Sequence, residues 1–129
     1  MKQQLAQIAL LVDDYDRAIR HYTQDWGFDL KEDTRISDTK RWVRIVPTGS
    51  TCGLLLAKAT NEQQLQAIGN QTGGRVFLFL HTDDFDRDFN RLINKEIKCR
   101  EQPRIESYGK VAVLEDMYGN AWDLIGPTE

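Results

Sequence analysis

The chain has 129 residues, a length typical of one domain, and we expect a single domain spanning residues 1–129. Its hydrophobic fraction of 40% and charged fraction of 29% are those of a folded globular protein and argue against wholesale disorder. Seventeen Lys and Arg residues against 20 Asp and Glu give a net charge of −3, so no nucleic-acid partner is expected.

The apolar runs and the cysteines indicate the cellular location of the protein. The longest apolar runs, Ile8–Val12 and Val76–Leu80, have five residues each, far too few to span a membrane. The first residues lack the apolar stretch of a secretory signal. Cys52 and Cys99 are too few for a disulfide scaffold and lack the spacing of a metal site. These features predict a cytoplasmic protein with no membrane partner.

A ten-residue stretch near the start of the chain recurs 70 positions later, where Leu78–Arg87 matches Ile8–Arg17. In both copies an Asp stands where a helix N-cap belongs, Asp14 in the first and Asp84 in the second. The alternative is two unrelated helices capped by Asp. Because the same order of elements follows each copy, an internal repeat is the better interpretation.

Each copy predicts a short apolar strand followed by an amphipathic helix, the strands being Ile8–Val12 and Val76–Leu80. Gly27 stands where a C′ glycine would end the first helix. The apolar positions at helical spacing are Tyr15, Ala18, Ile19, Tyr22 and Trp26 in the first helix, and Phe85, Phe89, Leu92 and Ile93 in the second.

Three strand candidates follow each helix, so the repeated unit is β-α-β-β-β. They are Phe28–Glu32, Arg41–Val46 and Thr51–Lys58 in the first copy, and Ile97–Glu101, Lys110–Leu114 and Ala121–Ile125 in the second. The two modules span residues 5–59 and 75–127, joined by a linker at residues 60–74. A short helix is predicted at Thr60–Ile68, because Thr60 and Gln63 have capping-box spacing and Gly69 would close it.

Two motifs carry a family likeness: Asp14–Ala18 with Trp26–Phe28 behind it, and Asp116–Asn120 followed by Trp122. With the repeated layout, they resemble the vicinal-oxygen-chelate superfamily, which contains glyoxalase I, bleomycin-resistance proteins, fosfomycin-resistance enzymes and extradiol dioxygenases. The resemblance implies an α+β fold in which two βαβββ modules form curved mixed sheets around a cleft, with helices on the outer faces. It also implies a small-molecule ligand and a homodimer, since single-domain relatives commonly pair.

Strand alternation then assigns side chains to the cleft or to the helices. If Leu10 faces its helix, Gln7 faces the cleft, and the repeat transfers that parity to the strand containing Phe79. The faces of Arg41–Val46 stay unassigned. Tyr108 lies in a loop that the family often places over the cavity, although a plain exposed loop is an equal alternative. The predicted ligand-binding residues are Gln7, Trp42, Arg44, Phe77, Phe79, His81, Tyr108 and Asp123.

The resemblance also raises the question of a metal, because metal-using members draw ligands from the first and last strand of each module. Those positions fall on Gln7, Phe77, Asp123 and a residue near Gly53 or Leu54, and only Asp123 is a usual ligand. We expect His21 at the surface of the first helix. His81 is expected at the rim of the pocket or in a hydrogen bond. We therefore predict no metal ligand and no cofactor, with a divalent metal as the alternative.

Without a metal, the superfamily's chemistry loses the Lewis acid that chelates two neighbouring substrate oxygens. We therefore predict a small-molecule-binding protein of the glyoxalase/bleomycin-resistance type, which holds an apolar or aromatic ligand and sequesters an antibiotic or toxin. The alternative is a glyoxalase-like lyase or dioxygenase that uses a divalent metal with Asp123 as a ligand. A metal-free proton-transfer enzyme with His81 or Asp123 as base is a third possibility. The sequence leaves open whether the protein is an enzyme and which molecule it binds.

Overall fold

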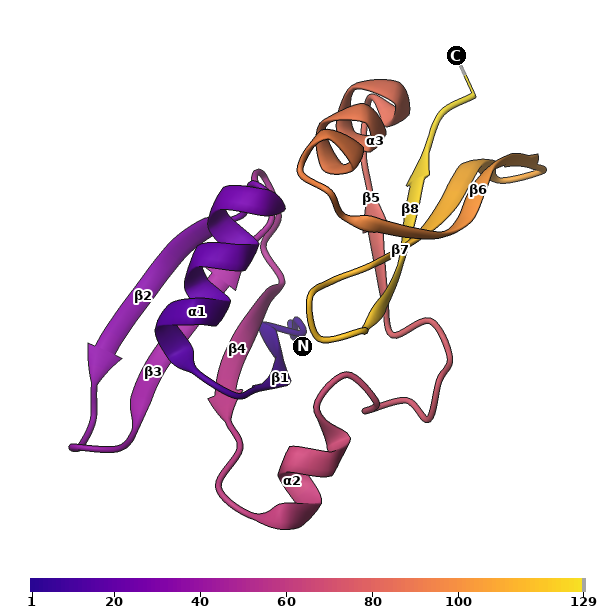
Figure 1. The fold of residues 1–129 in the computed structure, drawn as a ribbon. Coiled ribbons are helices and arrows are strands. Elements are labelled where there is room, and N and C mark those ends of the chain that lie inside the picture. The colour runs from indigo at the N-terminus through magenta and orange to yellow at the C-terminus, as the bar shows by residue number, and fades with distance from the viewer. Residues whose placement is uncertain (129) are drawn as a thin grey trace. The chain divides into compact units, whose positions relative to one another are not determined.

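Figure 1 shows the fold in a computed structural model, which describes residues 1–128. The chain divides into two compact units, residues 1–68 and the remainder of the described chain. Each unit contains one four-stranded mixed sheet and helices. The α+β fold of two β-α-β-β-β modules is therefore confirmed.

The sheet of the first unit has the strand order β1-β4-β3-β2. β1 (Gln7–Val12) runs parallel to β4 (Gly53–Lys58). β3 (Arg41–Val46) runs antiparallel to β4 and to β2 (Asp29–Arg35). β1 and β4 are joined by hydrogen bonds although the rest of the module separates them in sequence.

The helix between β1 and β2 has two parts. α1 (Tyr15–Arg20) begins after Asp14, whose carboxylate accepts the backbone N–H of Arg17 at 2.9 Å, as predicted for an N-cap. The chain then widens into the π-helical segment η1 (His21–Asp25). Gly27, with a φ of 78°, follows the end of the helix as predicted.

The π-helical segment turns His21 into the core. The side chain is 6% exposed, and its Nδ1 lies 2.9 Å from Asp25 Oδ2. The indole N–H of Trp26 donates to Nε2 of His21 at 3.1 Å. The expectation of a surface histidine is therefore wrong, because the extra residue of a π-turn rotates the side chains around it and hydrogen bonds satisfy both ring nitrogens.

Alternate side chains of the first sheet pack against this helix. The buried positions that alternate on this face are Leu10, Val12, Val43, Ile45, Leu54 and Leu56. They meet Ala18 and Tyr22, which are both fully buried. This alternation assigns the faces of β3, which the sequence left open: Trp42 and Arg44 lie on the face away from the helix.

The second unit repeats this arrangement with the strand order β5-β8-β7-β6. β5 (Leu78–His81) runs parallel to β8 (Ala121–Gly126). β7 (Gly109–Glu115) runs antiparallel to β8 and to β6 (Lys98–Glu106). The sheets of the two units therefore share one topology.

α3 (Phe85–Asn94) covers one face of this second sheet. Asp84 caps it by accepting the backbone N–H of Arg87 at 3.2 Å, again as predicted. The rings of Phe85 and Phe89 stack at 5.5 Å. The buried residues beneath and within the helix are Phe85, Leu92, Ala112, Leu114, Trp122 and Leu124.

The turn between β7 and β8 is built around the carboxylate of Asp116, which is 4% exposed. It accepts the backbone N–H groups of Tyr118 and Asn120 and the indole N–H of Trp122, each at 3.0 Å. The side-chain amide of Asn120 also donates to it. These bonds hold the start of β8 in register, and Asp123 lies on that strand.

The linker contains the helix α2 (Glu62–Ala67), shorter than predicted. Its N-cap is Asn61, which accepts the backbone N–H of Gln64 at 2.8 Å, so the predicted cap at Thr60 is wrong by one residue. Asn caps a helix at least as well as Thr. Thr60 instead donates its N–H and hydroxyl to the Gln64 side chain, at 2.8 and 3.0 Å. Gly69 follows with a φ of 74°, as predicted for the closing residue.

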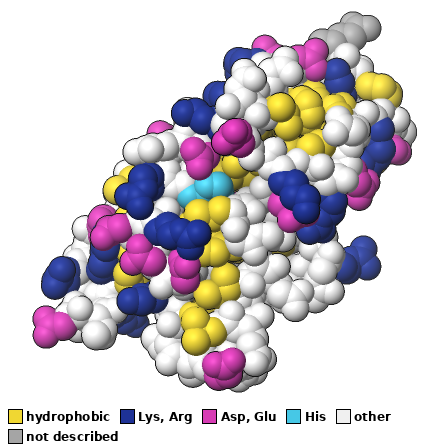
Figure 2. Space-filling view, in the orientation of Figure 1, with side chains coloured by type: hydrophobic (Ala, Val, Ile, Leu, Met, Phe, Trp, Pro, Cys, Tyr) yellow, Lys and Arg dark blue, Asp and Glu magenta, His cyan; other side chains and the backbone are white. Residues whose placement is uncertain are grey.

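Figure 2 shows basic and acidic side chains interspersed over the visible surface rather than gathered by sign. Across residues 1–128, none of the helices is both long and apolar enough to cross a membrane.

Candidate ligand-binding site

One row of side chains crosses all four strands of the second sheet. β5 pairs Phe79 with Asp123, β7 places Val113 opposite Asp123, and β6 places Glu101 opposite Val113. Because side chains alternate along a strand, this row lies on the face opposite to that of the buried Leu124. Phe79 and Asp123 therefore share the face away from α3, as predicted.

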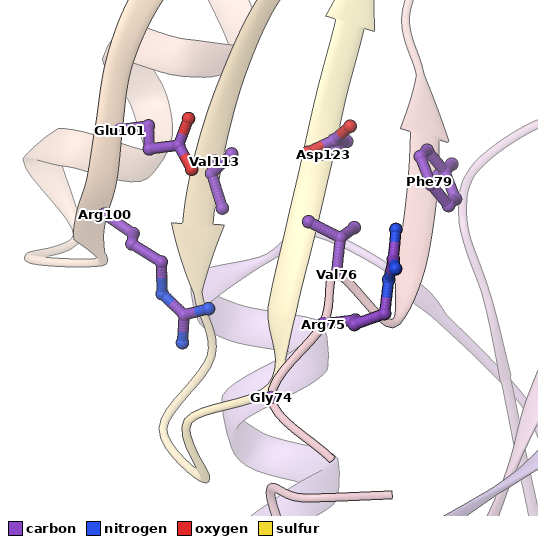
Figure 3. Close-up of a pocket in the computed structure, with 8 residues that line it drawn as sticks. All are labelled: Gly74, Arg75, Val76, Phe79, Arg100, Glu101, Val113 and Asp123. Atoms are coloured by element: carbon purple, nitrogen blue, oxygen red, sulfur yellow. The ribbon is translucent and has the colours of Figure 1, made fainter. Parts of the chain in front are cut away.

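The row borders a hollow of about 580 Å³, shown in Figure 3. Asp123 projects from β8 between Val113 and Phe79. Arg75 and Val76 precede β5 and line the same hollow, and the Arg75 side chain runs beside β5 toward Phe79. The volume lies within the range of small-molecule sites.

Asp123 is the polar centre of the hollow. Its side chain is 8% exposed, and Oδ1 is buried with no hydrogen-bond partner in the described part of the chain. Burial raises the pKa of Asp123 above its usual value; nearby Glu101 adds to this effect, while Arg104 opposes it. A buried carboxyl oxygen without a partner costs about 1–3 kcal/mol. Asp123 therefore carries an unsatisfied hydrogen-bond acceptor beside this hollow.

Three arginines line or flank the hollow, and two of them are paired with carboxylates. Arg100 Nε donates to Glu115 Oε2 at 2.9 Å, and Arg104 Nη1 donates to Glu101 Oε1 at 3.3 Å. The Arg75 side chain is exposed and has no such bond to any residue in 1–128. Arg75 is thus the uncommitted cation of this hollow.

Phe79 supplies the apolar wall. Its ring is 63% exposed, a large fraction for an aromatic side chain in a strand. A planar ligand in the hollow can stack on this ring and remove it from water.

Three of the predicted residues of the second unit lie elsewhere. Phe77 precedes β5, donates its backbone N–H to Ala121, and borders a different hollow of about 320 Å³. His81 shares the face of Phe79 but stands two residues further along the edge strand, exposed to solvent. Tyr108 is 59% exposed in a tight turn between β6 and β7. None of the three lines the hollow beside Asp123.

The predicted residues of the first unit form their own cluster. Arg44 Nε donates to Gln7 Oε1 at 3.1 Å, and Nη2 donates to the carbonyls of Ala6 and Thr51 at 3.2 and 2.9 Å. The guanidinium therefore ties the start of β1 to the loop before β4. Trp42 lies on the same face of β3, half-buried.

The residues at the family's metal positions do not fit a metal ion. β1 pairs Ala9 with Leu55 as β5 pairs Phe79 with Asp123, so Leu55 is the first-module counterpart of Asp123, rather than Gly53 or Leu54. Among the described residues, no three His, Cys, Asp or Glu side chains are grouped closely enough to hold a metal. One carboxylate does not complete a coordination sphere.

Sequence reasoning missed Arg75, Val76, Arg100, Glu101 and Val113. The pairing of β6 shifts register on both sides of Glu101, and these irregularities decide which of its residues reach the hollow. A signal was present for Val113, since alternation along β7 places it on the face opposite to Leu114.

Comparisons with known proteins agree with this fold. A protein of Shewanella frigidimarina (strain NCIMB 400), described as an uncharacterized protein, is 54% identical over 127 residues, 97% of this chain and 94% of that one. UcmS2, a solved structure, has a TM-score of 0.83 at 24% identity, covering 97% of this chain and 98% of its own. TnmS3, an antibiotic binding protein from Streptomyces sp. CB03234, has a TM-score of 0.77 at 26% identity, covering 98% and 97%.

The resemblance seen in the sequence is confirmed by a family model. The model of the Glyoxalase/Bleomycin resistance protein/Dioxygenase superfamily matches residues 4–124, nearly the whole chain. The repeated β-α-β-β-β module and the match together establish that the chain belongs to this superfamily.

Proposed function

We propose that the protein binds a small apolar or aromatic molecule in the hollow beside Asp123, without a metal ion, and so sequesters an antibiotic or toxic compound. The observation that carries this proposal is the buried, partnerless Oδ1 of Asp123 next to the exposed ring of Phe79. A ligand that donates a hydrogen bond to Asp123 and covers the ring of Phe79 would relieve both costs.

Similarity to TnmS3 supports the same role. That protein is described as antibiotic binding and is 26% identical to this chain over nearly its full length. Similarity of fold alone would not support a shared function. The similarity supports a shared role here because this chain also has an exposed aromatic ring, Phe79, beside a buried polar group, Asp123.

The proposal is tested by thermal shift with a library of aromatic compounds and antibiotics, since a ligand of the native state raises the apparent melting temperature. The same thermal-shift screen includes Ni²⁺, Zn²⁺, Mn²⁺ and Fe²⁺ as separate additions. We expect stabilisation by one or more organic compounds. Strong stabilisation by a divalent metal that is lost in Asp123→Ala would overturn the proposal in favour of a metal-dependent lyase or dioxygenase.

A matched pair of variants locates the binding site. Phe79 and Ile105 are both 63% exposed, but only Phe79 lines the hollow. Phe79→Ala should weaken binding of any library hit at least about tenfold, the effect of losing a stacked ring of roughly 1.4 kcal/mol. Ile105→Ala should leave binding unchanged. Equal effects of the two substitutions would place the ligand elsewhere.

The remaining binding residues stay predictions of the same kind. Each is tested by substitution against the same library hit: Gln7, Trp42, Arg44, Phe77, His81 and Tyr108. Arg44 needs one precaution, because its hydrogen bonds to backbone carbonyls are structural and its loss affects stability as well as binding.

We further propose that the protein is a homodimer in the cytoplasm. In the second sheet, β5 lies at an edge, and natural proteins usually cover an exposed edge strand. Cys52 and Cys99 are free thiols, which suits a reducing compartment. Light scattering at micromolar concentration tests the dimer, and a monomer of 14.9 kDa would contradict it. Cell fractionation tests the location.

A further inference from the structure

Resting on the proposed function, we infer the chemical class of the ligand. It is a planar aromatic acid that donates a hydrogen bond from an uncharged group to Asp123, stacks on Phe79, and places its acidic group against Arg75.

The hydrogen-bond donor follows from the state of Asp123. Asp123 lines an open hollow, and its buried Oδ1 has no partner among the described residues. A ligand that presents a donor to this carboxyl group reduces the cost of desolvating it. A ligand lacking the donor leaves the oxygen buried and unpaired.

The donor is uncharged because of the cations that border the same hollow. Arg75 and Arg100 both line it, and Arg104 is near enough to lower the pKa of Asp123. A ligand ammonium held beside Asp123 would share the hollow with the Arg75 guanidinium, which no carboxylate of the described chain neutralises and which would repel it. Arg100 and Arg104 contribute less repulsion, because they pair with Glu115, Glu101 and Glu106. A hydroxyl or an amide N–H gives the hydrogen bond without that repulsion.

The acidic group follows from the contrast between the two arginines of the hollow. The Arg100 guanidinium already bonds to Glu115, through Nε at 2.9 Å from Oε2. Arg75 has no carboxylate partner among residues 1–128, so it is the group that a ligand anion would pair with. Guanidinium recognises carboxylates through paired, charge-assisted hydrogen bonds.

An aromatic ring system connects the hydrogen-bond donor of the ligand to its acidic group. Figure 3 shows the Arg75 side chain running beside β5 toward Phe79, while Asp123 projects from the neighbouring strand β8. Phe79 and Asp123 are direct cross-strand partners, so a ring stacked on Phe79 lies next to the carboxyl group. A fused two-ring system is small enough for a hollow of about 580 Å³.

The test compares four fluorescent naphthalenes, each titrated into the full-length protein. Hydroxynaphthoate carries both the donor and the acid; naphthoate lacks the donor; naphthol lacks the acid; aminomethylnaphthol carries a cation in place of the acid. We expect hydroxynaphthoate to bind about tenfold or more tightly than each of the other three, the effect of one charge-assisted hydrogen bond.

Variants assign each end of the ligand to its residue. Arg75→Gln should abolish the advantage of hydroxynaphthoate over naphthol, while Arg100→Gln, whose guanidinium is already bonded, should preserve it. Asp123→Leu, which introduces the residue found at the equivalent position 55, should abolish the advantage over naphthoate. Circular dichroism and the melting temperature show whether each variant folds. Arg75 lies on an exposed loop, so Arg75→Gln still tests the inference if Asp123→Leu does not fold.

The outcomes separate this inference from the proposed function. Equal binding of naphthol and hydroxynaphthoate, tighter binding of aminomethylnaphthol, or equal loss in the two arginine variants would overturn the inference. Failure of all four probes would overturn it too. In each case the proposed function is still supported if other library compounds bind and Phe79→Ala weakens their binding. It is contradicted if no compound binds.

Discussion

Lys110 occupies in the second unit the position that Arg41 occupies in the first. The Arg41 guanidinium lies 5.2 Å from the ring centroid of Tyr15, and the Lys110 ammonium lies 5.2 Å from that of Phe85. Each cation also pairs with the acidic residue that follows the ring, at 2.8 Å for Arg41 with Asp16 and 2.7 Å for Lys110 with Asp86. The internal repeat therefore extends to a cation over the aromatic residue that opens each helix.

Arg41 and Lys110 differ in their other hydrogen bonds, and this difference gives a first prediction. Arg41 also donates from Nε and Nη2 to the two carboxylate oxygens of Asp33, at 3.1 and 2.7 Å. Because Lys cannot make this paired bond, Arg41→Lys should lower the free energy of unfolding by about 1 kcal/mol. Lys110→Arg should change it little. Urea denaturation measures both, and equal changes would show that Asp33 contributes nothing.

Local signals in the sequence predicted the starts of α1 and α3 and the order of the elements. The caps at Asp14 and Asp84 depend only on nearby residues, and the repeat then carried the order of strands from one module to the other. Alternation placed Phe79 and Asp123 on one face, because their pairing follows from two short strands without irregularities.

Features that depend on particular side-chain contacts were not predictable. The π-helical segment at His21–Asp25 has no signature in helical spacing, and it is stabilised by the bond between His21 and Trp26. The irregular pairing of β6 decides that Arg100 and Glu101 border the hollow. Register shifts of this kind come from packing across strands, which one sequence does not display.

The hydrogen bond between His21 and Trp26 gives a second prediction. His21→Phe leaves the indole N–H of Trp26, a residue 1% exposed, without its acceptor. This substitution should lower the free energy of unfolding by about 1–3 kcal/mol.

A double-mutant cycle separates that bond from packing. Adding Trp26→Phe to His21→Phe removes both partners, so the double variant should be less destabilised than the sum of the two single variants. Additive effects in urea denaturation would show that the bond contributes no stability.

The turn around Asp116 gives a third prediction. Asp116→Ala removes the acceptor of two backbone N–H groups and of the Trp122 indole N–H, in a place that is 4% exposed. We expect a loss of about 3 kcal/mol or more in the free energy of unfolding, since several buried donors lose their partner. Asp116→Asn retains one acceptor oxygen and should lose less. Differential scanning calorimetry ranks the two variants, and the reverse order would contradict this account.

The fourth prediction concerns the pH dependence that Asp123 imposes on stability. Burial raises the pKa of its carboxyl group in the folded state above the ordinary value of 3.8, with Glu101 adding to the shift and Arg104 reducing it. Below pH 3.8 the carboxyl group is protonated in both the folded and the unfolded state, so it has no effect on stability. Above that pH the unfolded chain releases the proton while the folded chain retains it, and stability falls until the pH passes the folded-state pKa.

The sign of this effect predicts that the candidate site makes the protein less stable at neutral pH. Asp123→Asn removes the titrating group, so it should raise the free energy of unfolding at pH 7 by about 1 kcal/mol or more, the scale of relieving a buried charge. The gain should shrink as the pH falls and disappear below about pH 3.8. Asp38→Asn, on an exposed loop, is the control and should change stability little at any pH. Urea denaturation from pH 3 to 8 measures both variants. A loss of stability in Asp123→Asn at pH 7 would mean that the carboxylate is held by partners in the free protein, and Asp123 would then be structural rather than a site held open for a ligand.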